Sequence, residues 1–188
     1  YAGTTTGDIY SGTNAAGSGT LYKSFSSSAN VLVRWVKGRL IATHGNAVHE
    51  GAGGTWTQLD PGTTFPSGWS WVDIAEGPAA IYLAGNAGDS SAIYKIDATA
   101  TSSAVSLSAL VQVADMPRGE TLNTIYAYVG GFLLIGTALG SRVAALNTDA
   151  TLTIGPLVHL SDDGVKDFVA VGSYVYAAVG SKCSKGNR

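Results

Sequence analysis

The chain is poor in charged residues. Only 13% of its 188 residues are Asp, Glu, Lys or Arg, against about 25% in ordinary soluble domains. The formal net charge is −2, and no stretch concentrates Lys or Arg. Nucleic-acid binding needs a basic face that neutralises phosphates, so we expect no nucleic-acid partner.

Cysteine and long apolar runs are also scarce. The single cysteine, Cys183, excludes an internal disulfide. The longest apolar run, residues 129–140, is too short and too rich in glycine to cross a bilayer, so we expect no membrane insertion. No stretch has a clear 3.6-residue hydrophobic period, and the best helix candidate, residues 103–114, fits an extended outer strand equally well.

What the chain does contain is a repeated strand–turn–strand unit. Residues 8–24 (DIYSGTNAAGSGTLYKS) and 80–96 (AIYLAGNAGDSSAIYKI) both begin with Ile-Tyr, turn through Gly and Asn, and end in an aliphatic-Tyr-Lys strand. Fainter copies of the unit occur elsewhere. The equivalent aliphatic positions are Ile9, Leu40, Ile81, Leu133 and Val175. Their spacings are 31, 41, 52 and 42 residues, and three of the four lie near the ~40–50 residues of a four-stranded propeller blade.

A second strand precedes four of these units. It is a short β-branched or aromatic run that ends at a glycine turn, and it covers residues 31–36, 69–75, 122–129 and 165–171. Glycine supplies the positive φ that tight hairpin turns require. The blade-length repeat favours a propeller over a sandwich, because radial repetition protects the edges of many short strands.

We therefore predict an all-β fold, a β-propeller of four-stranded antiparallel blades, with about four to five blades in this chain. The chain forms a single propeller segment. Its expected blade units are 1–30, 31–68, 69–121, 122–164 and an incomplete 165–188. The first unit is short for a blade, and both ends of the sequence look cut. We expect the chain to be part of a larger propeller.

Several motifs between Trp69 and Thr137 support a family resemblance. They are a tryptophan-rich strand, an A-E-G-P turn at 75–78, an I-Y-x-A/S-G-x-x-G-D hairpin at 81–89, an L-P-x-G-E connector at 116–120 with Met116 in place of Leu, and a G-x-L-L-I-G-T strand at 131–137. With these motifs the segment resembles the β-propeller region of minor tail proteins from bacteriophages of actinobacteria. The resemblance covers about the last two-thirds of the chain well.

The resemblance implies a structural or adhesive component of the virion, located outside the cell at the tail tip or tail fibre. It implies assembly into an oligomer with itself or with other tail proteins, and contact with the host envelope, where a cell-surface glycan is a further candidate partner. The shared motifs are structural rather than catalytic, so the resemblance implies no enzyme activity. We expect no cofactor.

A carbohydrate-binding propeller is the second hypothesis. Exposed aromatic side chains stack on sugar rings, because a ring offers an apolar face. Our candidates for glycan or partner contact are Trp69, Trp71 and Trp56. The competing interpretation is that aromatic side chains at these positions pack between blades.

A glycoside hydrolase is the third and weakest hypothesis. It needs two carboxyl groups facing each other at about 5–10 Å. Asp73, Glu76 and Asp167 occupy matching ends of the front strands and could ring the central face of the propeller. No nucleophile motif such as G-x-S-x-G is present, and we predict no catalytic residue.

Two further patterns are best explained as turns. Residues 49–56 (HEGAGGTW) resemble the end of a sialidase Asp-box but have Gly51 in place of its Asp, so they indicate a turn between outer strands. Residues 85–89 resemble a phosphate loop but lack the following Gly-Lys-Ser/Thr and helix, so they indicate a hairpin. His44 and His49 have no third ligand at a usual zinc spacing, and we expect no metal site.

Overall fold

The computed structural model describes residues 1–12, 19–25, 28–52, 54–60, 62–98, 107, 109–128, 131–158, 164–180 and 182–187. All named elements in these ranges are β-strands, and they form five antiparallel sheets, called blades 1 to 5 below. No helix in the described ranges has the length and apolar character of a membrane span.

Each blade is a run of consecutive strands. Blade 1 contains β1 (Ala2–Gly3), β2 (Asp8–Ser11) and β3 (Thr20–Ser24). Blade 2 contains β4 (Val31–Val36), β5 (Arg39–His44), β6 (Ala47–Ala52) and β7 (Thr55–Gln58). Blade 3 contains β8 (Ser70–Glu76), β9 (Ala80–Ala87), β10 (Ser90–Asp97) and β11 (Val111–Asp115). Blade 4 contains β12 (Leu122–Tyr128), β13 (Phe132–Thr137), β14 (Gly140–Leu146) and β15 (Leu152–Ile154). Blade 5 contains β16 (Val165–Val171), β17 (Tyr174–Val179) and β18 (Lys182–Asn187).

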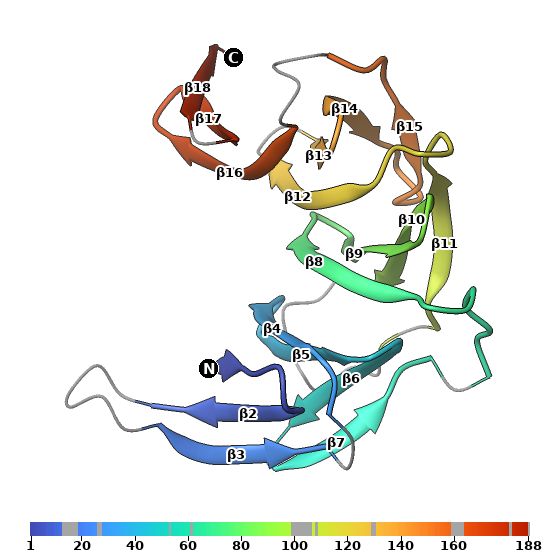
Figure 1. Ribbon diagram of the computed structural model, residues 1–188, viewed down its shortest axis with the longest axis vertical. Helices are drawn as coiled ribbons and strands as arrows, with labels where there is room; N and C mark the ends of the chain where they lie inside the picture. The colour runs from blue at the N-terminus through green and yellow to red at the C-terminus, as the bar shows by residue number, and fades with distance from the viewer. Residues whose placement is uncertain are drawn as a thin grey trace.

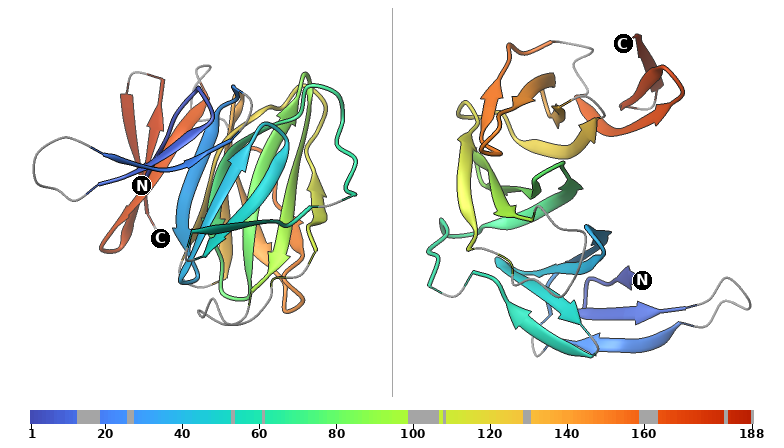
Figure 2. Two further views of the ribbon diagram at one scale, coloured as in Figure 1. Left: turned by 90° about the horizontal axis from the view of Figure 1, so that it is seen from below. Right: turned by 180° about the vertical axis from the view of Figure 1, so that it is seen from behind.

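The five blades follow one another along an arc, with both termini on its open side (Figure 1). The first strands of successive blades, β1, β4, β8, β12 and β16, contact one another and form the inner side of the arc. Seen from below and from behind, neighbouring blades stack face to face (Figure 2). This arrangement confirms the prediction of an all-β propeller. The end of the segment 103–114 is the outer strand β11, while 103–106 and 108 lie outside the described residues.

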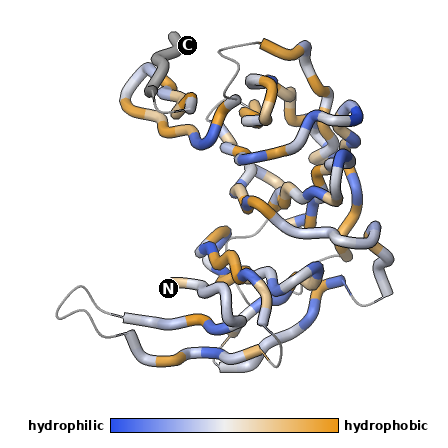
Figure 3. The backbone as a smooth tube through the Cα atoms, in the orientation of Figure 1, coloured by the Kyte–Doolittle hydropathy of each residue, from blue (hydrophilic) through white to orange (hydrophobic). Residues whose placement is uncertain are grey.

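The strand–turn–strand unit that recurs in the sequence begins with the second strand of a blade and continues into the third. Its five aliphatic positions fall in β2, β5, β9, β13 and β17, and hydrophobic segments recur along the strands of the blades (Figure 3). Ile81 and Leu133 are fully buried between blades. Burying an aliphatic side chain of this size contributes roughly 1.5–3 kcal/mol, so the repeat reflects the packing of one blade on the next.

Trp69 and Trp71 belong to the core between blades 2 and 3. Their side chains are only 6% and 5% exposed, and they form an aromatic cluster with Phe65 and Tyr94, with ring centroids 5.3–5.7 Å apart. The Trp71 indole donates a hydrogen bond of 2.8 Å to the carbonyl of Asn46. The suggestion that these two side chains contact a glycan or a partner is therefore wrong, since packing takes them away from solvent.

A glycine makes room for this cluster. A Cβ atom on Gly85 would lie well inside the van der Waals radius of the Trp69 indole, with Cε2 of the ring at 2.6 Å. Real Cβ atoms do not approach ring carbons this closely, so any larger residue would displace the indole or the strand. The A-G step at 84–85 in the hairpin motif is thus a packing requirement.

We predict that Gly85→Ala destabilises the protein by about 1–3 kcal/mol, the usual cost of overpacking a close-packed core. Chemical denaturation followed by tryptophan fluorescence measures the change. Ser70→Ala, an exposed substitution on the neighbouring strand β8, is the control and should leave the midpoint nearly unchanged. An unaltered midpoint for Gly85→Ala would contradict the packing described here.

Candidate functional site on the inner strands

The inner strands of blades 3, 4 and 5 share a local irregularity. Each pairs with its second strand in a register that shifts once, at Val72 in β8, at Asn123 in β12 and at Lys166 in β16. A bulge of this kind re-aims the following side chain. The residues after the three bulges are Asp73, Thr124 and Asp167.

Asp73 connects three blades through one carboxylate. Its Oδ1 accepts a hydrogen bond of 2.8 Å from the backbone N–H of Ile74. Its Oδ2 accepts bonds of 2.8 Å from the Thr124 hydroxyl and 3.0 Å from the Ile125 N–H, both in blade 4. On the other side, the Arg34 guanidinium of blade 2 lies 3.5 Å from Oδ1, although that cation is 58% exposed and water screens the pair.

Asp167 repeats the local half of this arrangement. Its Oδ1 accepts a 2.8 Å hydrogen bond from the N–H of Phe168, as Asp73 does from Ile74. The residue is exposed, and within the described residues no hydrogen bond joins its side chain to another blade. Repeat symmetry therefore produces the same carboxylate in two different settings.

These groups line a cleft on the inner side of the arc. It has a volume of about 290 Å³. Its lining residues are Arg34, Asp73, Ile74, Ala75, Glu76, Ile125, Tyr126, Ala127 and Asp167. The prediction that Asp73, Glu76 and Asp167 share the central face is confirmed. Glu76, however, accepts a 2.6 Å hydrogen bond from the N–H of Lys37, so it too joins one blade to the next.

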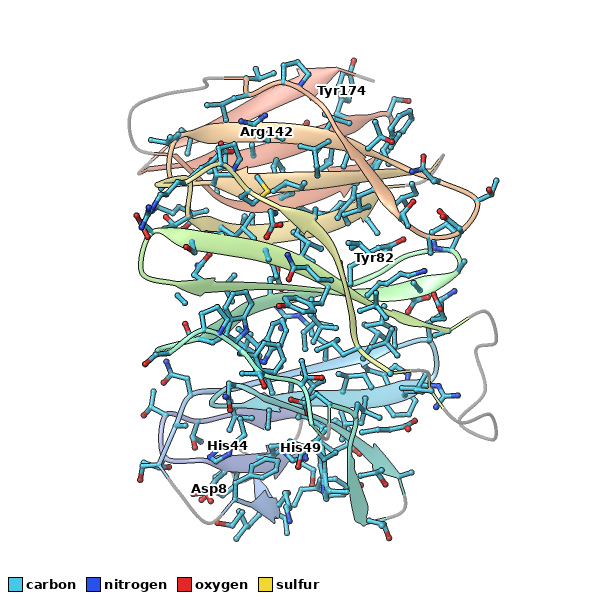
Figure 4. The ribbon with its side chains drawn as sticks, turned by 90° about the vertical axis from the view of Figure 1, so that its right-hand side faces the viewer. Asp8, His44, His49, Tyr82, Arg142 and Tyr174 are labelled. Carbon is cyan, nitrogen blue, oxygen red and sulfur yellow. The ribbon has the colours of Figure 1, made fainter. Side chains whose placement is uncertain are left out.

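The connector between blades 3 and 4 contains a buried ion pair. Glu120 is 2% exposed and accepts two hydrogen bonds from Arg142, of 2.7 and 2.8 Å. This bonding raises the pKa of Arg142 above its ordinary value, and the guanidinium also donates to the carbonyl of Gly155 at 2.8 Å. Arg142 lies among the blade 4 side chains in Figure 4. A bidentate, desolvated pair of this kind fixes geometry as well as charge.

Two neutral contacts reinforce the same interface. The side-chain amide of Asn86 on β9 both donates to the carbonyl of Leu122 at 2.8 Å and accepts from its N–H at 3.0 Å. The Tyr82 hydroxyl, labelled in Figure 4, donates to the carbonyl of Ala150 at 2.9 Å. Burial is the largest cause that raises the pKa of Tyr82, to about 12, so this hydroxyl keeps its proton at ordinary pH.

The two histidines singled out above both contact one aromatic ring, that of Phe25. Phe25 stacks on His44 with centroids 4.6 Å apart and lies 4.9 Å from His49, and Figure 4 shows the two histidines near each other. Burial lowers the pKa of His49. In the part of the chain that the structure describes, no group of three or more His, Cys, Asp or Glu side chains is placed to hold a metal ion.

Trp56 is half-buried and packs on blade 1. Its ring makes edge contacts with Tyr22 at 6.1 Å and Phe25 at 5.9 Å, and it covers Gly51 closely. The exposed tryptophan is instead Trp35 on β4, which is 65% exposed. The sequence does not distinguish Trp35 from the other tryptophans, because the pattern of residues 31–36 does not indicate which side of the strand meets solvent.

Comparisons with known proteins extend the fold assignment. The chain matches the crystal structure of a catalytically inactive variant of virginiamycin B lyase from Staphylococcus aureus, solved with quinupristin, with a TM-score of 0.63 and 16% sequence identity. The match covers 95% of this chain and 58% of the lyase chain, so this chain spans less than two thirds of that protein's length. No protein-family model and no curated protein sequence matches the chain. At this identity the similarity supports the propeller fold alone.

We predict that Asp73→Ala destabilises the protein by about 2–4 kcal/mol, because it leaves the buried Thr124 hydroxyl and the Ile125 N–H without their acceptor. Asp167→Ala is the matched control: it removes the carboxylate at the same register in blade 5, and we expect a much smaller loss. Urea denaturation of both variants measures the difference. Equal losses would show that the bonds between blades contribute nothing beyond the local turn.

We also predict that His49 makes the protein less stable in mild acid. Burial lowers the pKa of folded His49 below the ordinary 6.5. As the pH falls below about 6.5, the unfolded chain therefore takes up a proton at His49 before the folded protein does. The free energy of unfolding decreases as the pH falls through this range. In His49→Gln this part of the pH dependence should disappear. Thermal melts across that range measure it, and an identical slope in the variant and the wild type would contradict the assignment.

Proposed function

We propose that the chain is a structural and adhesive component of a bacteriophage tail. In this proposal it lies at the tail tip or fibre, assembles with other tail proteins, and contacts the host envelope. The proposal is supported by the resemblance of the motifs between Trp69 and Thr137 to minor tail proteins of actinobacterial phages, and several of these motifs make contacts that join blades. The chain thus uses those residues to build a rigid scaffold.

The polar residues of these motifs illustrate the point. In the A-E-G-P turn, Glu76 accepts the Lys37 N–H, and the carbonyl of Pro78 accepts a 2.5 Å bond from the Lys37 ammonium. In the connector, Glu120 holds Arg142, and the N–H of Gly119 donates to the Asp89 carbonyl at 2.7 Å. Contacts of this kind hold neighbouring blades in a fixed register, which is consistent with a structural role.

The hydrolase alternative has weaker support. Asp73 and Asp167 do line one cleft, but both oxygens of Asp73 already accept hydrogen bonds from the protein. A catalytic carboxyl group must instead reach the bond that it protonates or attacks. The lyase reaction of the structural neighbour is not part of the proposal, because a shared fold does not imply a shared chemistry.

The carbohydrate-binding alternative is favoured by one specific observation, the exposed indole of Trp35. Tryptophan is enriched at binding interfaces because it joins a large apolar ring to a polar N–H, so this side chain is a candidate contact surface. It is compatible with the tail proposal, because an adhesive protein needs a group on the host to recognise.

Immunogold electron microscopy of purified particles of the phage that encodes this chain tests the proposal. We expect an antibody to the chain to label the distal end of the tail, while pre-immune serum labels nothing. Particles disrupted by mild denaturant serve as the second sample, because assembly can bury the epitope. Absence of label from both intact and disrupted particles, together with absence of its peptides from the virion by mass spectrometry, would overturn the proposal.

A further inference from the structure

A second cleft, which shares no lining residue with the inner cleft, lies between blades 1 and 2. Its volume is about 230 Å³. Its lining residues are Tyr1, Tyr22, Trp35, Gly38, Arg39, Leu40, Gly51 and Ala52. Three of these residues are aromatic, two of them from blade 1 and one from blade 2, so the cleft exists only because the two blades stand side by side.

The blade repeat shows that Trp35 is not needed for packing. Trp35 pairs with Leu40, the repeat-equivalent aliphatic residue of blade 2. In blades 3, 4 and 5 the residues that pair with the equivalent positions are Glu76, Ala127 and Ala170. Three blades thus form with Glu or Ala at this position. Blade 2 has an indole there that is 65% exposed.

The aromatic rings on the blade 1 side of the cleft contact one another and Trp56 of blade 2. Tyr1 and Tyr22 meet edge to face with centroids 5.1 Å apart, and Tyr22 in turn rests on Trp56 at 6.1 Å. Edge-to-face pairs of this kind hold their rings in preferred orientations. The wall of the cleft is therefore preformed on the blade 1 side.

The polar side of the cleft is electrically neutral. Arg39 lines it with a side chain that is 2% exposed, and its guanidinium forms an ion pair with Glu50, whose side chain is 14% exposed. Because the two charges cancel, the pair adds no net attraction for an anion or for a cation beside the aromatic rings.

From this combination we infer that the cleft between blades 1 and 2 binds a neutral saccharide, with one face of a hexopyranose ring stacked on Trp35. A sugar ring has an apolar C–H face and a rim of hydroxyl groups, and the cleft has an aromatic wall and a neutral polar side. Its volume is smaller than the roughly 300–1,000 Å³ of sites for drug-sized ligands, which fits a single ring better than an extended peptide.

The inference rests on the adhesive part of the proposed function. It assigns the contact to Trp35 in place of the buried Trp69 and Trp71.

The tail proposal and the sugar-binding inference can be tested separately. A protein found on the tail that binds no sugar would retain the tail proposal and lose this one. A sugar-binding protein absent from the virion would do the reverse.

Titration of the purified chain with methyl glycosides of neutral hexoses tests the inference, by calorimetry and by tryptophan fluorescence. We expect a dissociation constant in the millimolar range for at least one of the gluco, galacto and manno forms. Trp35→Ala should weaken it by about tenfold or more, which corresponds to a loss of about 1.4 kcal/mol. Ala52→Phe should have the same effect by filling the cleft, because Ala52 is an exposed lining residue.

Tyr174→Ala is the matched control, since Tyr174 is a partly exposed aromatic residue on blade 5. It should leave sugar binding unchanged, and circular dichroism checks that each variant is folded. Failure of all three glycosides to bind at tens of millimolar would overturn the inference, as would binding that survives both Trp35→Ala and Ala52→Phe. Binding of choline or of a proline-rich peptide in the absence of sugar binding would also overturn it.

Discussion

The structure depends on the way each blade is fixed to the next, and the carboxylate of Asp73 is the clearest case. Its two oxygens accept bonds from its own strand and from the inner strand of blade 4. A charged acceptor of buried donors is strong in this setting, because the donors have no water to replace it. Hydrophobic burial pulls blades together without a preferred register, whereas these directional bonds set the register.

Hydrophobic burial and directional polar contacts have the same two roles along the interface between blades 3 and 4. Buried aliphatic side chains such as Ile125 and Leu133 form the core there, and the Glu120–Arg142 pair and the Asn86 amide set its alignment. Breaking one partner of such a buried pair leaves an uncompensated charge, which costs far more than an exposed pair contributes. The exposed pair of Arg118 and Asp89 illustrates the other case: hydrogen bonding to the guanidinium lowers the pKa of Asp89, but both groups remain in water.

Much of this fold could be predicted from the sequence, because the repeat is recorded in residues whose roles are local. Gly at the hairpin turns and aliphatic residues at one period identify the second strand of each blade, from Ile9 to Val175. The matching ends of the inner strands likewise placed Asp73 and Asp167 on one face. What could not be predicted was which aromatic side chains meet solvent. Trp35 and Trp71 occupy similar runs in sequence, yet one is 65% and the other 5% exposed, because exposure depends on what the adjacent blade places opposite each ring.

This contrast indicates where a repeat protein of this kind can acquire recognition. Most positions that recur from blade to blade are committed to packing or to bonds between blades, so a change there costs stability before it adds contact surface. A position whose residue differs from blade to blade has no packing role common to all blades. At the register position of Trp35, blades 3, 4 and 5 have Glu76, Ala127 and Ala170. The large exposed ring in blade 2 therefore adds little to the core. Since the cleft beside it is formed by two blades, the rigid stacking that holds the propeller together would also preorganise the cleft, which reduces the entropy lost when a ligand binds.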